Sequence, residues 1–384
     1  MERKKILFLN NKDIWNPASG GGTQLIFRLM NTLSKRNHSI TLLCGKFPGS
    51  KEHEWINGMK IIRKGGLFTT YPFTFLNYLR ESEKERFDLV IDCALQGVPF
   101  FSPLYVRSPI IALFFHLEKE VFFHEMPLEL GGRLASKVMG NLAYAIESGL
   151  VPILYRKVLK ITFSESTRRD MIKTGYRGTI EVLQEGINLA AYGPSKRKAD
   201  DPLLVYLGRL RRYKGVDDAI RAMKLVVREF PDAKLSIVGR GRYEGELRSL
   251  TKRLGICKNV VFHGYVDEHE KIRILQRAHI LIMPSYREGW ATPVIEANAC
   301  GTPAVVSDAM GVAETVMHGE TGFVYPLRDV EKMAEFIGIL LRDESVRDRF
   351  YYNVLKWAKQ FEWKASEERF VSICEEMMGL DGKG

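Results

Sequence analysis

The sequence predicts an α/β protein that is built from two doubly wound domains of the Rossmann type. Three observations support this fold class. The chain has 384 residues, more than one domain usually holds. Its composition, 45% hydrophobic and 27% charged, is typical of globular proteins and excludes collagen-like, coiled-coil and disordered chains. Short apolar runs alternate with longer amphipathic runs, and this alternation indicates the strands and helices of parallel sheets.

The first half contains short runs that are rich in branched and aromatic residues, as buried parallel strands are. These predicted strands lie at 6–9, 40–43, 89–92, 110–115 and 161–163. The helical patterns between them lie at 23–36, 73–85, 134–159 and 166–174. The run 6–9 is too short for the apolar core of a signal peptide, so we interpret it as a first strand.

The second half repeats this alternation more regularly. Its predicted strands lie at 203–207, 235–238, 260–263, 280–283, 304–307 and 323–324. Its predicted helices lie at 216–229, 244–254, 268–276, 293–299, 312–318, 330–341 and 345–360. A polar segment at 191–202 with Gly193, Pro194 and Pro202 indicates a linker, so we expect domains at 1–192 and 199–360. A cleft between the two sheets is the expected ligand site.

Charge and cysteine content restrict the class of partner and the compartment. The net charge is +11, and residues 1–198 hold all of it, with 29 Lys and Arg against 18 Asp and Glu. This favours an anionic partner, such as a phosphorylated substrate, a membrane surface or a nucleic acid, although a solubilising surface is the alternative. Five cysteines without a Cys-x-x-Cys pair argue against a disulfide framework or zinc site, and they favour a reducing, cytoplasmic setting.

The segment 284–303 is the most informative part of the chain. It follows a predicted strand, and Thr292 and Pro293 are suited to the N-cap and first position of a helix. The free N–H groups at such a helix start can bind a phosphate. Glu288 precedes this helix and Glu296 lies within it, so two carboxylates flank the helix start, as acceptors for sugar or ribose hydroxyls. The alternative is that both glutamates are exposed and solvated.

Glu288 to Glu296, followed by Ala-Asn-Ala-Cys-Gly-Thr-Pro, resembles the retaining GT-B glycosyltransferases of family 4, the glycosyl transferases group 1. The resemblance covers nearly the whole chain and includes the segments 163–166, 185–188, 206–215, 237–241, 261–266 and 318–326. It implies the GT-B fold, with a first domain that binds the acceptor and a second that binds a sugar nucleotide. It also implies that a final helix in 361–384 packs back on the first domain.

The resemblance implies a role for each matching residue. Arg209 and Lys214 grip the diphosphate of the donor, Glu296 holds its ribose, and Glu288 holds a hydroxyl of its sugar. The expected donor-binding residues are Gly21, Gly22, Arg209, Lys214, Gly239, Tyr265, Glu288, Gly289, Trp290, Ala291, Thr292 and Glu296. Ala291 stands where many relatives have a second glycine. For Arg209 and Lys214 the alternative is a solvated basic loop, because Arg211 and Arg212 lie beside them.

Two features of the first half complete the predicted site. Ser19-Gly-Gly-Gly-Thr23 lies between a strand and a helix and resembles the family's glycine-rich loop, although a plain turn is the alternative. It is not the Gly-x-Gly-x-x-Gly pattern of nicotinamide binding. His116 ends the strand 110–115, where the family commonly has a histidine near the reacting oxygen, and the alternative is a structural histidine. The expected catalytic residues are His116, Glu288, Arg209 and Lys214.

The resemblance implies transfer of a hexose from a UDP- or GDP-linked sugar to a hydroxyl acceptor, with retention and by front-face substitution. The sequence contains no Asp-x-Asp metal motif, and we expect neither a metal nor a cofactor. The expected acceptor is lipid-linked or phosphate-linked. The basic, apolar segment 133–160, with Lys137, Arg156, Lys157 and Lys160, could lie on an anionic membrane and offer a lipid-linked acceptor. The alternative for that segment is a core helix.

Three further readings remain as alternatives to the transferase. Two keep the fold and change the reaction, to a phosphorylase or a nucleotide-sugar epimerase. The third is a nucleic-acid-binding module, which only the net charge suggests, because the sequence has no basic–aromatic stacking pattern. We therefore expect no nucleic-acid partner, and we place the protein in the cytoplasm or at the cytoplasmic face of the membrane.

Overall fold

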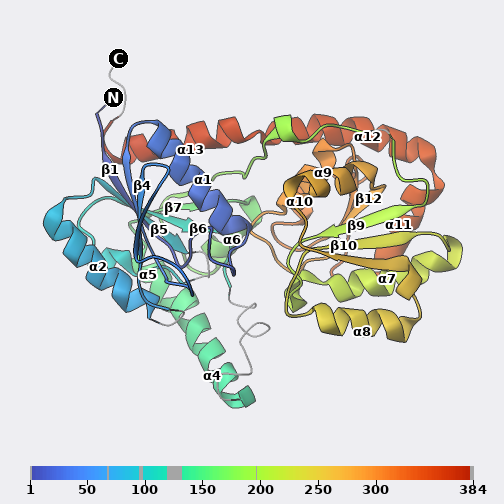
Figure 1. Ribbon diagram of the computed structural model, residues 1–384, viewed down its shortest axis with the longest axis horizontal. Helices are drawn as coiled ribbons and strands as arrows, with labels where there is room; N and C mark the ends of the chain where they lie inside the picture. The colour runs from blue at the N-terminus through green and yellow to red at the C-terminus, as the bar shows by residue number, and fades with distance from the viewer. Residues whose placement is uncertain (1, 67–68, 95–97, 119–131, 196, 381–384) are drawn as a thin grey trace. The chain divides into compact units, whose positions relative to one another are not determined.

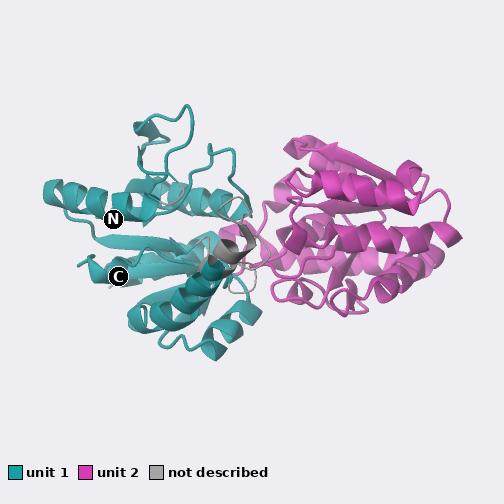
Figure 2. Cartoon of the chain, turned by 90° about the horizontal axis from the view of Figure 1, so that it is seen from below, with its two compact units in different colours: residues 1–183, 366–384 teal, residues 184–365 magenta. Residues whose placement is uncertain are grey.

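The structure is a computed structural model of the whole chain, and it describes residues 2–66, 69–94, 98–118, 132–195 and 197–380. The chain divides into two compact units (Figure 2). Unit 1 consists of Met1–Leu183 and Ser366–Gly384, and unit 2 of Gln184–Ala365. The linker predicted at 191–202 therefore lies inside unit 2. The roles expected for the two domains stay predictions at this point.

Unit 1 is built on an eight-stranded sheet with the order β3-β4-β2-β1-β5-β6-β7-β8. All neighbouring strands are parallel except the β3–β4 pair. The strands are β1 (Lys5–Leu9), β2 (Ser39–Cys44), β3 (His53–Ile56), β4 (Met59–Arg63), β5 (Leu89–Ala94), β6 (Ile110–Phe114), β7 (Leu159–Thr162) and β8 (Ile180–Val182). The central strands are almost fully buried, which explains why they are continuous apolar runs in the sequence.

The helices of unit 1 cover both faces of this sheet. They are α1 (Gly21–Lys35), α2 (Thr70–Lys84), α4 (Gly132–Ala145), α5 (Val151–Leu154), α6 (Glu165–Lys173) and α13 (Trp363–Met377), with a 3-10 turn at Ser102–Leu104 and a π-helical turn at Ile146–Leu150. The chain moves in opposite directions along the sheet from β1 to β2 and from β4 to β5, so right-handed connections place α1 and α2 on opposite faces (Figure 1). The final helix α13 lies with α1, where Arg28 pairs with Glu367 at 2.9 Å.

Unit 2 has a six-stranded parallel sheet with the order β11-β10-β9-β12-β13-β14. Its strands are β9 (Leu203–Leu207), β10 (Lys234–Val238), β11 (Val260–Gly264), β12 (Ile280–Met283), β13 (Ala304–Ser307) and β14 (Gly322–Tyr325). The direction of winding changes between β9 and β12. At this point the loops of an open α/β sheet separate, and ligands bind there.

The helices of unit 2 are α7 (Val216–Glu229), α8 (Glu244–Leu254), α9 (Glu268–Arg277), α10 (Thr292–Ala299), α11 (Val330–Arg342) and α12 (Glu344–Ala358), with 3-10 turns at Arg212–Lys214, Cys257–Asn259, Ala313–Thr315 and Lys359–Phe361. Apolar residues of α7, α8 and α11 form one core with β9 and β10. The helices α9 and α10 lie on the other face of the sheet (Figure 1). This arrangement leaves the carboxyl edge of the sheet to loops.

The structure also shows where the local patterns mislead. The strands β3, β4 and β8 are absent from the prediction. β3 and β8 are short and have no buried residue, whereas in β4 the apolar run is interrupted by Lys60 and Arg63. The helix predicted at 312–318 is only the turn Ala313–Thr315. The helix predicted at 134–159 is broken into α4, the π-helical turn and α5. Within the described residues, no helix combines the length and the apolar character that crossing a bilayer requires.

Candidate functional site

The predicted donor residues of unit 2 lie on loops at one edge of its sheet. Arg209 follows β9, Gly239 follows β10, Tyr265 follows β11 and Glu288 follows β12. Because these strands are parallel, their carboxyl ends meet at the same edge, and residues distant in the sequence are neighbours there.

Two glycines allow the first two of these loops to touch. Gly239 has a φ of +133°, and its N–H donates to the carbonyl of Gly264 at 2.8 Å. A Cβ atom at Gly239 would lie 1.9 Å from the carbonyl oxygen of Gly208, so only glycine fits. Gly239 therefore allows the loops after β9 and β10 to pack closely against each other.

Lys214 and Glu288 form a buried ion pair at this edge. The Lys214 Nζ lies 2.5 Å from one carboxylate oxygen of Glu288 and 2.6 Å from the other. The two residues are 8% and 9% exposed. Burial lowers the pKa of Lys214, but the charge of Glu288 more than offsets this, and the pKa lies above its usual value. Neither residue is solvated, so the solvated alternatives are wrong for both.

The loops that carry this pair are fixed by backbone contacts. The Tyr286 N–H donates to the Tyr213 carbonyl at 2.8 Å, which ties the Lys214 turn to the loop after β12. The Glu288 N–H donates to the Met310 carbonyl at 3.0 Å. A Cβ atom at Gly311, whose φ is +69°, would lie 2.1 Å from the Glu288 carbonyl oxygen. The ion pair is therefore positioned by the main chain as well as by its own charges.

The helix α10 begins one residue earlier than expected. Thr292 is its first residue, Ala291 occupies the N-cap position, and no side chain caps the helix, so the prediction of Thr292 as the N-cap is wrong. Among the described residues, the Gly289 and Trp290 N–H groups donate to no main-chain carbonyl. Donors of this kind beside a helix start are suited to an anion.

Trp290 is packed rather than free. Its ring lies 5.4 Å from the ring of Phe361, measured between centroids, and the residue is 7% exposed. A contribution of Trp290 to donor binding would therefore come from its backbone. Tyr265 is different, because 74% of it is exposed and its side chain is available for contact with a ligand.

Glu296 projects from α10 into a small polar cluster. One carboxylate oxygen accepts from Lys271 Nζ at 2.8 Å and from the Tyr192 hydroxyl at 2.7 Å. Its side chain is 12% exposed, so the solvated alternative is wrong here too. Arg209, in contrast, is exposed, and its side chain has no ion pair within the described residues. Its charge is therefore available to a ligand.

The predicted residues of unit 1 lie at the carboxyl edge of that unit's sheet. Gly21 and Gly22 begin α1 after β1, and a Cβ atom at Gly21 would meet nothing within 4 Å. Packing within the chain therefore does not require glycine there. His116 lies two residues beyond β6 and is partly buried, with its Nε2 3.6 Å from a carboxylate oxygen of Glu118.

A buried ion pair that the sequence did not reveal supports the glycine loop. Arg63 on β4 donates to Asp13, and both side chains are almost fully buried. The Asp13 carboxylate also accepts from the N–H groups of Trp15 and Asn16, and Ser19 Oγ donates to the Asp13 carbonyl. Asp13 is adjacent to the first strand, but its partner lies 50 residues away in a strand that the local pattern did not predict.

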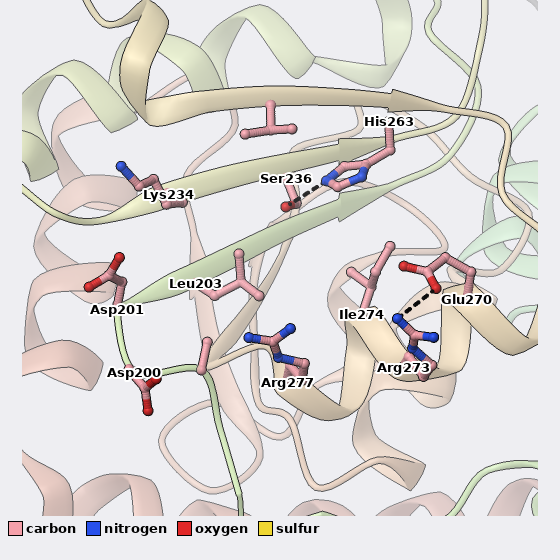
Figure 3. Close-up of a pocket in the computed structure, with 12 residues that line it drawn as sticks. Asp200, Asp201, Leu203, Lys234, Ser236, His263, Glu270, Arg273, Ile274 and Arg277 are labelled. Carbon is pink, nitrogen blue, oxygen red and sulfur yellow. Dashed lines mark hydrogen bonds and ion pairs between the residues drawn. The ribbon is translucent and has the colours of Figure 1, made fainter.

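A separate cavity of about 480 Å³ lies in unit 2 (Figure 3). Leu203 and Lys234, which line it, begin β9 and β10, so it opens toward the amino ends of these strands. None of the predicted site residues lines it. Its side chains are mixed in charge, and Arg273 is already paired with Glu270 at 3.3 Å. This cavity is therefore not the expected phosphate site.

Residues 193–357 match the family model of glycosyl transferases group 1. The match supports a group 1 glycosyltransferase, and it covers the part of unit 2 that holds Arg209, Lys214, Glu288 and Glu296. Solved structures are similar in fold over nearly the whole chain. Sucrose-phosphate synthase of Thermosynechococcus elongatus has a TM-score of 0.81 at 20% identity, covering 99% of this chain and 100% of the other. HepE of Anabaena, in complex with UDP-glucose, has a TM-score of 0.72 at 18% identity, covering 97% and 100%. The fold is GT-B.

Curated relatives include several proteins that are named as sugar transferases. Glycogen synthase of Mycobacterium tuberculosis is 32% identical over 225 residues, which are 57% of this chain and 54% of that protein. A GDP-mannose-dependent phosphatidylinositol monomannoside mannosyltransferase of Corynebacterium glutamicum is 32% identical over 209 residues, 50% of this chain and 54% of that protein. The matches thus span about half the length of these relatives.

Proposed function

We propose that this protein is a retaining hexosyltransferase that uses a nucleotide-diphosphate sugar, with UDP or GDP as the nucleotide. The observation that carries the proposal is the buried Lys214–Glu288 pair beside the start of α10, with Arg209 exposed nearby in the sequence and Glu296 within the helix. This set supplies cations and N–H groups for a diphosphate and carboxylates for sugar and ribose hydroxyls. The group 1 match and the UDP-glucose complex of HepE support it.

The proposed reaction is a front-face substitution. The bond from the anomeric carbon to the diphosphate oxygen breaks, and a bond to the acceptor oxygen forms on the same face. The acceptor proton passes to the departing phosphate, which leaves as the nucleoside diphosphate. Arg209 and Lys214 stabilise the charge that builds on the diphosphate, so no metal or cofactor is required. Glu288 positions the sugar, and His116 donates a hydrogen bond near the reacting oxygen.

Thermal-shift measurements with UDP-, GDP- and ADP-sugars test donor binding. A ligand that binds only the folded state at about 100 times its Kd adds roughly 2.7 kcal/mol to the free energy of unfolding. We expect one sugar nucleotide to raise the midpoint temperature of unfolding in the wild type. It should raise it equally in the control variant Glu335→Gln, because Glu335 is an exposed residue of the same unit. Glu288→Gln and Glu296→Gln should reduce the shift. No shift with any donor would contradict the proposal.

Product analysis separates the transferase from its alternatives. Incubation of the donor with candidate hydroxyl acceptors should yield a glycoside with the anomeric configuration of the donor, as seen by proton NMR. Isomerised donor without acceptor would indicate an epimerase, and sugar 1-phosphate formed from a glycan and phosphate would indicate a phosphorylase. Salt-sensitive DNA binding without donor binding would favour the nucleic-acid module.

We also propose that the acceptor is lipid-linked and that unit 1 meets it at an anionic membrane on the cytoplasmic side. The support is that three elements of unit 1, α2, the turn Ser102–Leu104 and α5, expose apolar side chains. Leu76 is 55% exposed, Leu104 70% and Ile153 75%. The ring of Phe75 on α2 lies 5.1 Å from the ring of Tyr105, measured between centroids, so the first two elements are contiguous. Membrane-bound surfaces combine apolar and basic side chains in this way.

The charges beside this surface agree only in part with the prediction. Arg156 and Lys157 are exposed and can face lipid headgroups. Lys160 is fully buried, so its assignment to a membrane-facing side is wrong. The side chains of Arg133 and Lys137 lie outside the described residues.

Vesicle flotation tests the membrane surface. Anionic phosphatidylglycerol vesicles should carry the protein upward at low salt, and less so at high salt. The double variant Leu76→Ser with Ile153→Ser should float less, whereas Leu327→Ser, an exposed apolar residue of unit 2, should float as wild type does. Absence of binding at low salt would contradict the membrane contact and leave the transferase proposal intact.

A further inference from the structure

Four polar side chains of unit 2, one of them Glu296, form a cluster that holds the Glu296 carboxylate. Lys271 Nζ lies 2.8 Å from one oxygen of Glu296 and 2.9 Å from an oxygen of Glu268. The Tyr192 hydroxyl lies 2.7 Å from the same two oxygens. The cluster joins the first turn of α9, the middle of α10 and the beginning of the segment predicted as a linker, where Tyr192 lies. Sequence reasoning singled out only Glu296.

The cluster leaves the two oxygens of Glu296 in different situations. Lys271 and Tyr192 both lie at Oε1, which is thereby occupied. For Oε2, no partner is found within the described part of the chain. A carboxylate held by one oxygen cannot rotate freely, and its other oxygen stays available as a hydrogen-bond acceptor.

Tyr192 and Lys271 both stay protonated, so both remain hydrogen-bond donors to Glu296. Burial, followed by the charge of Glu296, raises the pKa of the Tyr192 hydroxyl well above its usual value, so it stays protonated. Burial alone would lower the pKa of Lys271, but Glu296 and Glu268 outweigh it and the pKa lies above its usual value. Neither donor is lost at neutral pH.

We propose that Lys271 and Tyr192 are positioning residues that hold Glu296 for a ribose hydroxyl, and that they set the preference of this site for ribonucleotides over deoxyribonucleotides. The inference rests on the proposed function, since it takes Glu296 as the ribose acceptor. With one cation for two carboxylates, the cluster is negative and suits hydroxyl donors, whereas Arg209 and Lys214 suit the diphosphate.

A purely structural role makes a different prediction. If the cluster only ties α9 to α10, its loss weakens binding of every nucleotide by the same factor. If it positions Glu296, its loss weakens a ribonucleotide and has little effect on a 2′- or 3′-deoxy analogue, which lacks the hydroxyl. The ratio of the two Kd values therefore distinguishes the two roles.

The experiment is calorimetric titration of the full chain with UDP, GDP and ADP and with their 2′-deoxy and 3′-deoxy analogues. For the nucleotide that binds, we expect wild type to prefer the ribo form over one deoxy analogue by roughly 10- to 100-fold, as for a hydrogen bond to a charged group. Tyr192→Phe and Lys271→Met should lower this ratio severalfold, mainly by weakening the ribo form. Lys252→Met, an exposed lysine of α8, should keep the wild-type ratio.

The outcomes separate this inference from the proposed function. A wild-type protein that binds no nucleotide overturns both. A wild type that binds the ribo and deoxy forms equally, or variants that keep the wild-type ratio, overturn the positioning role and leave the transferase proposal standing. Tyr192→Phe removes one oxygen atom only, so it provides the test even if Lys271→Met does not fold.

Discussion

Two buried lysines, one in each unit, differ in what holds them. Lys160 on β7 is fully buried, and its Nζ donates to the carbonyls of Tyr155 at 2.9 Å and Val158 at 2.5 Å. Lys214 is almost as buried but pairs with the Glu288 carboxylate. Burial lowers the pKa of Lys160 to about 8, whereas the pKa of Lys214 lies above its usual value.

The difference teaches how to interpret a buried cation. Two neutral carbonyls accept hydrogen bonds from Lys160 but do not balance its charge, and we assign this lysine a structural role. At Lys214 an anion balances the charge and lies on a loop where a ligand is expected. A diphosphate that approached Lys214 would compete with Glu288 for the same ammonium group. We therefore expect substitutions of the two lysines to differ in their effects on transfer and on stability.

The largest expected effect is the loss of transfer in Lys214→Met. Removing a group that stabilises charge in the transition state costs roughly 10²- to 10³-fold in kcat. Breaking a buried pair also costs about 3–5 kcal/mol of stability, because Glu288 is left without its counterion. The double variant Lys214→Met with Glu288→Gln should recover much of that stability in urea unfolding but none of the transfer. Recovery of transfer in the double variant would contradict the assigned role.

Arg209→Ala should have the next largest effect, on donor binding rather than on stability. Its side chain is exposed and has no ion pair within the described residues, so folding does not depend on it. We expect the Kd of the donor to rise by about 10- to 100-fold, the value of a charge-assisted contact. Titration calorimetry measures this change. Arg211→Ala is the neighbouring control, and an equal effect there would favour a general basic surface.

The smallest expected effect is the pH dependence that Lys160 produces. Its folded pKa, about 8, lies below the unfolded value of 10.5, so the unfolded chain holds more protons between these values. The free energy of unfolding should therefore rise by about 1–2 kcal/mol from pH 7 to pH 9.5. Lys160→Met should flatten this rise without affecting transfer. Urea unfolding at both pH values measures it, and an unchanged slope in the variant would contradict the assignment.

Much of the fold could be predicted because its signals are local. The alternation of buried strands and amphipathic helices indicates two doubly wound sheets, and the comparisons confirm the GT-B fold that the resemblance implied. The segment around Glu288 and Glu296 stands out for the same reason, since a strand, a loop and a helix start follow each other within 20 residues. Short, half-polar strands such as β3 and β8 lack the continuous apolar run by which the other strands are predicted.

The sequence by itself determined the fold class, the order of the main elements and the loops on which the candidate residues lie. Only the tertiary structure decided their partners. Lys214 meets Glu288 across 74 residues, and Tyr192 meets Glu296 across 104. It also decided that Lys160 is buried whereas Lys157, three residues before it, is exposed. The physical reason is that periodicity records which face of an element is apolar, whereas contacts between loops depend on strand order, which brings distant segments to one edge.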